Sequence, residues 1–310
     1  EEFFFESNIP LVVDAGPLTR LDAELAYRFS DYSTSGSVDT YKAALSAAFL
    51  DERFRLRTGF NRAIRAPNIG ELYLDNQIAL WAGDDPCAGP TPEYSPAECA
   101  RTGVPVDRYG TVAANPASQY NQFIGGNPDL EPEEAETWTF GFTASPIDNL
   151  DIAVDYYDIK LENAISTIGA RTIMDLCATG QDEMCSLIRR NATTLDLFRG
   201  SDPSSSGMVI NTNGNFGGRR FRGIDLSGAY GFPLGNGRMS LSFSGNYILE
   251  KEYSPVPGDD SATYSCEGLI NSSCATPKWR HIASARYSFD RYTVGLRWRH
   301  IGEMDYEDVD

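Results

Sequence analysis

The chain has 310 residues, and its 44 Asp and Glu against 26 Lys and Arg give a formal net charge of −18. This charge argues against nucleic acid as a partner, because nucleic-acid-binding proteins need a basic surface. The mean hydropathy of −0.34 and the lack of any long apolar run exclude a helical membrane span. They leave room for a membrane β-barrel, whose strands place only alternate residues in lipid.

Ten segments of the chain alternate apolar and polar residues. In the second segment, for example, Leu21, Ala23 and Leu25 alternate with Asp22 and Glu24. Period two places the two sets on opposite faces of a sheet, and each run has about the length that a tilted strand needs to cross a bilayer. We therefore predict an all-β fold, an antiparallel transmembrane β-barrel. Its strands are expected at residues 2–9, 20–31, 38–49, 53–64, 134–145, 150–162, 222–233, 238–251, 278–289 and 292–302.

The connections between these strands are of two kinds. Residues 50–52, 146–149, 234–237 and 290–291 are short and polar, as hairpin turns are. Three connections are long and irregular, and each follows such a hairpin: residues 65–133, 163–221 and 252–277. Only the early connections, 10–19 and 32–37, do not belong clearly to either kind. Outer-membrane barrels have short periplasmic turns and long extracellular loops, whereas compact soluble domains rarely contain structureless loops of this length.

Aromatic residues border the short turns, and each belongs to the apolar set of its own strand. These residues are Phe49, Phe54, Phe232, Phe289 and Tyr292. A barrel needs such a girdle where lipid meets water. The alternative is that these side chains pack in the core of a β-sandwich, since aromatic residues are common in strands generally. Their common phase at one end of the strands favours the girdle.

The long loops carry all six cysteines and many of the acidic residues. The cysteines form one close pair in each loop, which predicts three disulfides made in an oxidising compartment: Cys87–Cys99, Cys177–Cys185 and Cys266–Cys274. Zinc is the competing interpretation, but the spacings lack a two-residue knuckle and the chain has only two histidines. The loop acids, Asp85 and Asp182 among them, are expected to be exposed and to keep the loops soluble.

Under the barrel interpretation, the direction of each strand determines on which side of the membrane the two ends of the chain lie. The first strand runs inwards and the last runs outwards, so both ends lie outside, whereas an exported barrel is expected to keep its ends in the periplasm. Ten strands also close into a narrow barrel, for which a loop as long as 65–133 is outsized. We therefore expect residues 1–310 to be an arc of a larger barrel.

Five segments resemble TonB-dependent outer-membrane receptors, in the order in which that family has them. They are FRLRTGFNRAIRAPNIGELY (54–73), GGNPDLEPEEAETWTFGF (125–142), LDIAVDYYDIKLENAIS (150–166), RGIDLSGAYGF (222–232) and PKWRHIASARYSF (277–289). The resemblance implies a 22-stranded barrel with an N-terminal plug domain, in the outer membrane of a Gram-negative bacterium. Such receptors bind a scarce small-molecule solute and import it with energy from the TonB complex. We expect the plug, the TonB-contacting N-terminal region and the closing strands to lie outside this chain.

The family motif falls on both ends of the first long loop and on the strand after the second. Its residues are Arg62, Arg65, Ala66, Pro67, Asn68, Glu71, Asn127, Pro128, Leu130, Pro132, Glu133, Gly223 and Asp225. Pro67 favours an extended or turn conformation before it and donates no hydrogen bond, which suits a strand that leaves the sheet. Glu133 and Glu134 can pair with Arg62 or Arg65 across the hairpin. We interpret the motif mainly as architecture, with ligand contact as the alternative.

Charged residues on the polar phase of three strands are candidates for the lumen of the barrel. They are Arg53, Arg55, Arg57, Arg297 and Arg299, together with Asp151 and Asp155. A polar interior is expected of a barrel. One hypothesis is that these charges contact the plug and rearrange when it moves. The alternative, which we favour slightly, is that Arg and Asp pair across neighbouring strands, where water leaves such pairs little energy.

The ligand-binding candidates are aromatic residues of the first long loop. They are Tyr73, Trp81, Tyr94, Tyr109, Tyr120 and Phe123. Aromatic faces can stack on sugars or on catecholate iron chelators, although most loop aromatics pack the loop against itself. The sequence does not choose among iron chelate, cobalamin and carbohydrate, and it indicates no cofactor and no metal site.

The main rival class is a secreted soluble β-rich protein, either a glycosidase or a carbohydrate-binding protein. A glycosidase needs two carboxylates about 5–10 Å apart, and this chain has many Asp and Glu. They are scattered over loops and turns, with no Ser-His-Asp order, no HExxH and no Gly-rich phosphate loop. The sequence therefore predicts a receptor in contact with outer-membrane lipid rather than an enzyme.

Overall fold

The computed structural model describes residues 1–34, 36–256, 263–270 and 274–306, and the chain divides into two units. Unit 1 consists of Glu1–Ala66, Pro132–Ala164 and Gly217–Asp310, and unit 2 of Pro67–Glu131 and Ile165–Phe216. Residues 257–262 and 271–273 of the third predicted loop lie outside the described residues.

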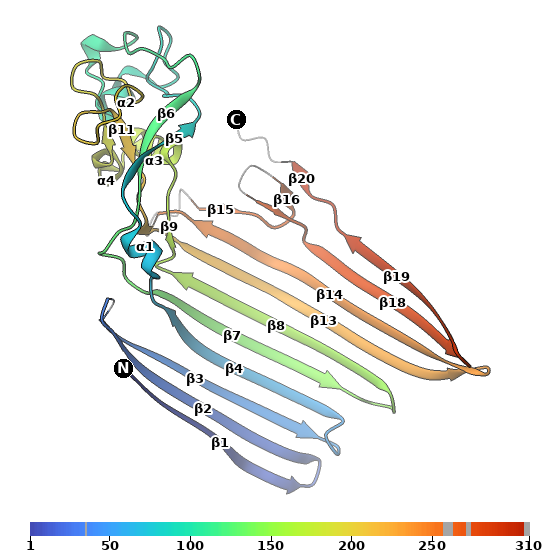
Figure 1. The fold of residues 1–310 in the computed structure, drawn as a ribbon. Coiled ribbons are helices and arrows are strands. Elements are labelled where there is room, and N and C mark those ends of the chain that lie inside the picture. The colour runs from blue at the N-terminus through green and yellow to red at the C-terminus, as the bar shows by residue number, and fades with distance from the viewer. Residues whose placement is uncertain (35, 257–262, 271–273, 307–310) are drawn as a thin grey trace. The chain divides into compact units, whose positions relative to one another are not determined.

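Unit 1 is built on one antiparallel sheet whose long strands lie side by side in chain order (Figure 1). The strands are β1 (Glu2–Ala15), β2 (Leu18–Tyr32), β3 (Gly36–Phe49), β4 (Phe54–Arg65), β7 (Glu133–Ala144), β8 (Leu150–Glu162), β13 (Gly218–Leu234), β14 (Gly237–Ser254), β18 (Trp279–Phe289) and β19 (Tyr292–Ile301). All ten strands predicted from alternation are confirmed. Short strands complete the unit: β15 (Tyr264–Ser265) pairs with β14, and β16 (Leu269–Ile270), β17 (Ala275–Thr276) and β20 (Asp305–Tyr306) form a separate small sheet.

The first connection is a tight turn, which corrects the expected loop at residues 10–19. Strands β1 and β2 continue past Pro10 and meet at Gly16 and Pro17, where Gly16 has φ +63°. The register shifts between Pro10 and Val12, at a residue that has no N–H to give to the ladder. The proline therefore bends the strand without ending it, and this turn resembles the other short turns.

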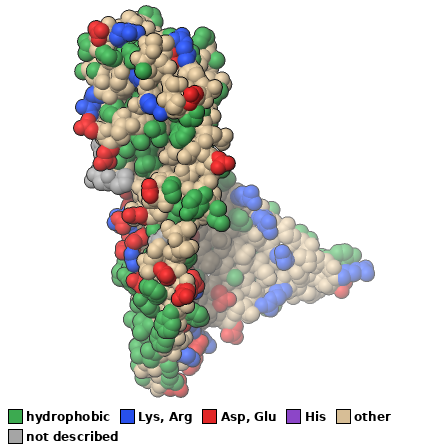
Figure 2. Space-filling model, turned by 60° about the vertical axis from the view of Figure 1, so that its left-hand side comes forward, with side chains coloured by type: hydrophobic (Ala, Val, Ile, Leu, Met, Phe, Trp, Pro, Cys, Tyr) green, Lys and Arg blue, Asp and Glu red, His purple; other side chains and the backbone are tan. Residues whose placement is uncertain are grey.

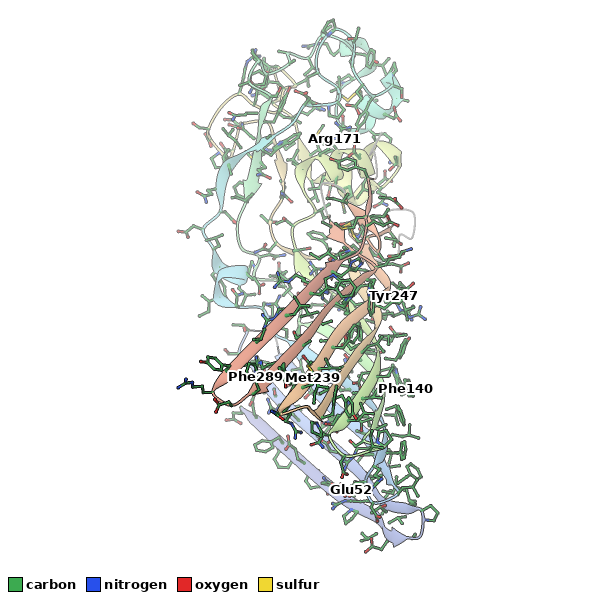
Figure 3. The ribbon with its side chains drawn as sticks, turned by 90° about the vertical axis from the view of Figure 1, so that its right-hand side faces the viewer. Glu52, Phe140, Arg171, Met239, Tyr247 and Phe289 are labelled. Carbon is green, nitrogen blue, oxygen red and sulfur yellow. A yellow bond between two sulfur atoms is a disulfide. The ribbon has the colours of Figure 1, made fainter. Side chains whose placement is uncertain are left out.

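Strand register gives the sheet one apolar and one polar face. One row of the apolar face runs through Ile9, Ala23, Leu45, Thr58, Phe140, Tyr156, Ile224, Tyr247 and Trp279. A neighbouring row of the polar face runs through Asp22, Ser46, Arg57, Gly141, Asp155, Asp225, Asn246 and Arg280. Phe140 and Tyr247 project to the same side (Figure 3) and are 51% and 40% exposed.

The apolar face is too large to be stable in water. Hydrophobic side chains gather along the lower left of Figure 2, while charged side chains mark the surface that recedes to the right. Soluble monomers rarely expose contiguous apolar patches beyond a few hundred Å². This face carries exposed Phe, Leu, Val and Trp side chains on strand after strand, from Phe3 to Trp298. It therefore needs an apolar environment.

Unit 2 is folded, although residues 65–133 and 163–221 were expected to be irregular. It contains α1 (Ile69–Tyr73), β5 (Gln77–Ala82), α2 (Pro96–Arg101), η1 (Val106–Arg108), β6 (Gln119–Ile124), β9 (Ile165–Ser166), α3 (Ala170–Thr179), α4 (Asp182–Ser186), β10 (Ile188–Arg189), β11 (Met208–Ile210) and β12 (Gly214–Asn215). Strands from both segments share one sheet in the order β10-β11-β6-β5. Its core includes Tyr120, Ile173, Met174, Leu197 and Met208, all less than 2% exposed.

All three predicted disulfides are present. Cys87–Cys99 lies in a small core of unit 2 with Val104 and Val112, and Cys177–Cys185 joins α3 to α4. Cys266–Cys274 belongs to unit 1. Among the described residues, no helix is both long and apolar enough to cross a membrane.

Candidate functional site

Most of the family motif in unit 2 builds the start and the return of the first long loop. Asn68 caps α1: its side chain accepts from the Glu71 N–H at 2.9 Å, and the Glu71 carboxylate accepts from the Asn68 N–H at 2.8 Å. Such a capping box satisfies N–H groups that a helix start leaves without partners. The N–H of Asn127 donates to the Glu71 carbonyl at 2.9 Å. These motif residues therefore hold the two ends of the loop together.

The motif residues of unit 1 also have structural contacts. Arg62 pairs with Glu134 at 2.7 Å and Arg65 with Glu133 at 2.6 Å, both across the β4–β7 hairpin. A Cβ atom at Gly223 would lie 2.7 Å from the Tyr247 carbonyl oxygen, so this position needs glycine. Asp225 accepts a hydrogen bond from Asn246 at 2.8 Å. These contacts support the interpretation of the motif as architecture.

The arginines of the polar face fall into two groups. On β4, Arg57 pairs with Asp155 at 2.6 Å. Nearer the turn, Arg55 pairs with Glu52 at 3.1 Å, and Arg53 donates to the Pro146 carbonyl at 3.3 Å. On β19, neither Arg297 nor Arg299 has an ion-pair partner within the described part of the chain. The expected pairing of Arg with Asp thus holds for Arg57 and not for the β19 arginines.

The aromatic candidates of unit 2 differ greatly in exposure. Tyr120 is fully buried and Trp81 is 8% exposed, and their rings pack 5.5 Å apart. Tyr120 also contacts Phe198 edge to face. These rings pack the unit's own core, so they have no free face for a ligand. Phe123 is half-buried on β6, whereas Tyr73 is 58% exposed at the end of α1.

Tyr94 belongs to a charged cluster that the sequence did not indicate. Its hydroxyl donates to the Asp175 carboxylate, and its ring lies 5.7 Å from the Arg171 guanidinium. Arg171, labelled in Figure 3, pairs with Glu93 at 2.5 Å and with Asp175 at 2.9 Å. Burial, followed by the hydrogen bond to Asp175, raises the pKa of Tyr94 above its usual value. No local signal could have linked residues 81 positions apart, and the Tyr109 hydroxyl, which donates to the Tyr94 carbonyl, completes the cluster.

Asp85 was expected to be an exposed loop acid, and this expectation was wrong. Its side chain is fully buried and pairs with Arg190, itself 3% exposed, at 2.7 Å. Asp85 also accepts from the Cys87 N–H at 3.0 Å, beside the Cys87–Cys99 disulfide. A buried carboxylate needs such partners, because removing a charge from water is costly. This pair is enclosed within unit 2 and offers no open site.

Groups that could hold a metal ion are absent among the described residues, where no three His, Cys, Asp or Glu side chains lie suitably together. In the part of the chain that the structure describes, polar side chains that a solute can reach lie on the polar face of unit 1 and near the exposed Tyr73 and the half-buried Tyr94 of unit 2.

The comparisons with known proteins agree with this architecture. The family model described as TonB dependent receptor-like, beta-barrel matches residues 2–310. No curated protein matches the chain. The family match gives no support to the secreted carbohydrate-binding protein or glycosidase.

Solved structures similar to this chain include three receptors or transporters. The siderophore receptor PirA from Acinetobacter baumannii has 15% identity and a TM-score of 0.50, over 98% of this chain and 34% of its own. A ferric enterobactin receptor variant from Pseudomonas aeruginosa (PfeA), in complex with enterobactin, has 16% identity and a TM-score of 0.52, over 96% and 39%. The copper transporter OprC has 14% identity and a TM-score of 0.46, over 97% and 35%. At these identities the likeness concerns the fold, and the chain spans between a third and two fifths of these proteins.

Proposed function

Since the chain belongs to the TonB-dependent receptor family through its β-barrel domain, we propose that it forms part of an outer-membrane active-transport receptor. The receptor binds a scarce solute at its outer face and imports it with energy supplied by the TonB complex. The candidate solutes are a siderophore-bound iron, cobalamin or a carbohydrate.

The observation that carries this proposal is the two-faced sheet of unit 1. Register aligns apolar side chains on one face and polar side chains on the other across strands from β1 to β18. An outer-membrane barrel has this arrangement, with lipid outside and a polar interior. A soluble protein would have to cover the apolar face with other protein.

The ten long strands are an arc of a larger barrel in this proposal. Strands β1 and β19 are the edges of the sheet in the residues that the structure describes. Within lipid, an open sheet edge leaves backbone groups without hydrogen-bond partners, so the barrel must close through further strands. The segments 65–133, 163–221 and 252–277 are then its long extracellular loops.

The partner of the polar face is expected to be a plug domain or the passing solute. Arg53, Arg55 and Arg57 already have partners within unit 1, which weakens the hypothesis that they contact a plug. Tyr73, on the other hand, is exposed in unit 2 and Tyr94 is half-buried, and both remain ligand-contact candidates.

Uptake by the bacterium that makes this protein tests the proposal. Deletion of its gene should reduce uptake of one labelled solute among a ferric siderophore, cobalamin and an oligosaccharide, down to the level of a TonB-deficient strain. The protein should also occur in the outer-membrane fraction and migrate differently on gels before and after heating. Unchanged uptake of the whole panel, or recovery of the protein in the soluble fraction, would contradict the proposal.

A further inference from the structure

Neither segment of unit 2 forms more than paired strands by itself. The first segment, Pro67–Glu131, contributes β5 and β6, and the second, Ile165–Phe216, contributes β10 and β11, which pair over two residues. One sheet results because β11 lies parallel to β6, through Val209–Gln122 and Ile210–Phe123. An isolated two-stranded ribbon is at best marginally stable in water, so each pair of strands needs the other.

Backbone hydrogen bonds continue this seam on both sides of the two ladder pairs. The Asn121 N–H donates to the Leu197 carbonyl at 2.7 Å, and the Asn211 N–H donates to the Phe123 carbonyl at 2.8 Å. Strand β6 therefore has β5 on one side and the second segment on the other. Since buried backbone groups need partners, β6 cannot stay ordered when the second segment leaves it.

Asparagine side chains add further hydrogen bonds between the two segments. Asn121 is 3% exposed, and its amide donates to the carbonyls of Gly200 and Gly207 at 3.2 and 3.1 Å. At the ends of the two segments, the Asn215 side chain accepts from the Glu131 N–H and donates to the Glu131 carbonyl, both at 2.8 Å. A primary amide carries both donors and an acceptor, so it replaces backbone partners where the sheet ends.

Two arginines also join the segments. Asp85 of the first segment pairs with Arg190 of the second, and both side chains are buried. The Arg190 guanidinium also donates to the Thr102 carbonyl at 2.8 Å. In the opposite direction, Arg101 of the first segment donates to the Cys177 carbonyl at 2.8 Å. Separation of the segments would break these contacts together and would leave a buried charge pair without its partners, which is costly.

We propose that the two segments form one cooperative body, in which a displacement or local unfolding of either segment is transmitted to the other through the β6–β11 seam. Proteins open locally in such cooperative units. The contacts that carry this inference all lie within unit 2. Its consequence for transport rests on the proposed function: the first two extracellular loops change position together, so a solute that contacts one loop acts on both.

Native-state hydrogen exchange of the purified whole protein in detergent, over a series of urea concentrations, tests the proposal. The slowest amides of β6 and α3 belong to different segments. We expect them to converge on one opening free energy with one urea dependence, because a single opening exposes both. Two separate urea dependences would show independent loops and overturn the proposal. Convergence that includes β7 and β8 of unit 1 would show an opening of the whole protein and also overturn it.

A variant of the seam tests the transmission directly. Asn121→Ala removes two hydrogen bonds to the second segment and should accelerate the exchange of α3 about tenfold or more. The matched control is Asn76→Ala, at an exposed asparagine of the first segment that makes no side-chain hydrogen bond within the described residues. It should change the exchange of α3 less than about twofold.

Acceleration by Asn121→Ala that stays within the first segment would contradict transmission, as would equal effects of the two variants. If Asn121→Ala does not fold, the urea series on the unmodified protein still decides. Failure of the two proposals is distinguishable. Independent loops in a protein that supports TonB-dependent uptake refute only the cooperative body, and a single opening without such uptake refutes only the transport function.

Discussion

Arg57 and Asp155 form an ion pair although their strands are not neighbours. Their closest nitrogen and oxygen atoms lie 2.6 Å apart, and β7 runs between β4 and β8. The residue of β7 in register with both is Gly141. A Cβ atom there would lie 2.3 Å from the Asp155 carboxylate and 2.4 Å from the Arg57 Nε. The ion pair can therefore form because Gly141 has no side chain that would separate Arg57 from Asp155.

This arrangement predicts that the coupling energy between Arg57 and Asp155 depends on Gly141. The side chains of Arg57 and Asp155 are 48% and 35% exposed, so the coupling between Arg57→Gln and Asp155→Asn should be less than about 1 kcal/mol. In a Gly141→Val background the coupling should vanish, since the new side chain separates the charges. Urea unfolding of the four variants in each background measures both values. A coupling that persists with valine would refute the role of Gly141.

Arginine substitutions on the two faces of the sheet test whether the apolar face contacts lipid. Phe140 projects from that face, whereas its neighbour Thr139 lies on the polar face. Phe140→Arg should reduce the stability of the protein in lipid vesicles by up to about 2–4 kcal/mol, the penalty near the bilayer centre. Thr139→Arg should cost much less, because its side chain points away from lipid. Equal losses from the two variants would argue that the Phe140 face is not in lipid.

Removal of one partner of the buried pair Asp85–Arg190 should destabilise unit 2 strongly. Asp85→Ala leaves the Arg190 guanidinium buried without its counter-charge, which typically costs about 3–5 kcal/mol. Hydrogen exchange of β5, β6 and α3 should accelerate accordingly. The control is Asp182→Ala, which removes the partner of Arg101 at a 92% exposed site and should cost less than about 1 kcal/mol. If both variants exchange alike, the burial argument fails.

The stability of the first turn of α2 should fall at acidic pH. The Ser95 side chain, followed by the Ser95 N–H that donates to the Glu98 carboxylate at 2.7 Å, lowers the pKa of Glu98 below its usual value. A lowered folded-state pKa contributes stability above the unfolded pKa and loses it as pH falls through the folded value. Amide protection of α2, corrected for intrinsic exchange, should therefore fall in that acidic range. Glu98→Gln should remove this pH dependence, and an unchanged profile would contradict the assignment.

The sequence predicted features that depend on neighbouring residues better than features that depend on contacts between distant segments. All ten long strands followed from alternation, because the side-chain period of a strand is visible in neighbouring residues. Pro10 concealed the extension of β1, since proline usually ends a strand and here sits at a register shift. Unit 2 was missed because its elements are short and its sheet joins distant segments: β11 pairs with β6 through Val209–Gln122 and Ile210–Phe123.

The candidate site shows the same division. The six aromatic candidates were chosen by residue type, and the structure separated buried Tyr120 from exposed Tyr73. Nothing near Asp85 in the chain indicated its burial, because Arg190 is 105 residues away. The structure has Arg55, Arg57, Arg297 and Arg299 on the polar face of the sheet, as the sequence predicted, whereas the sequence left open whether they pair with Asp or contact a plug.

The sequence alone determined which side chains share a face, and with it the apolar and polar sides of the sheet, because period two is a local property of the backbone. The sequence also indicated that Arg62 and Arg65 pair with Glu133 and Glu134, but the tertiary structure decided which of the other charges meet. Arg57 reaches Asp155 from 98 residues away, and Arg190 reaches Asp85 from 105 residues away. Partners depend on strand order and register, and these are set by contacts between segments that no local pattern records.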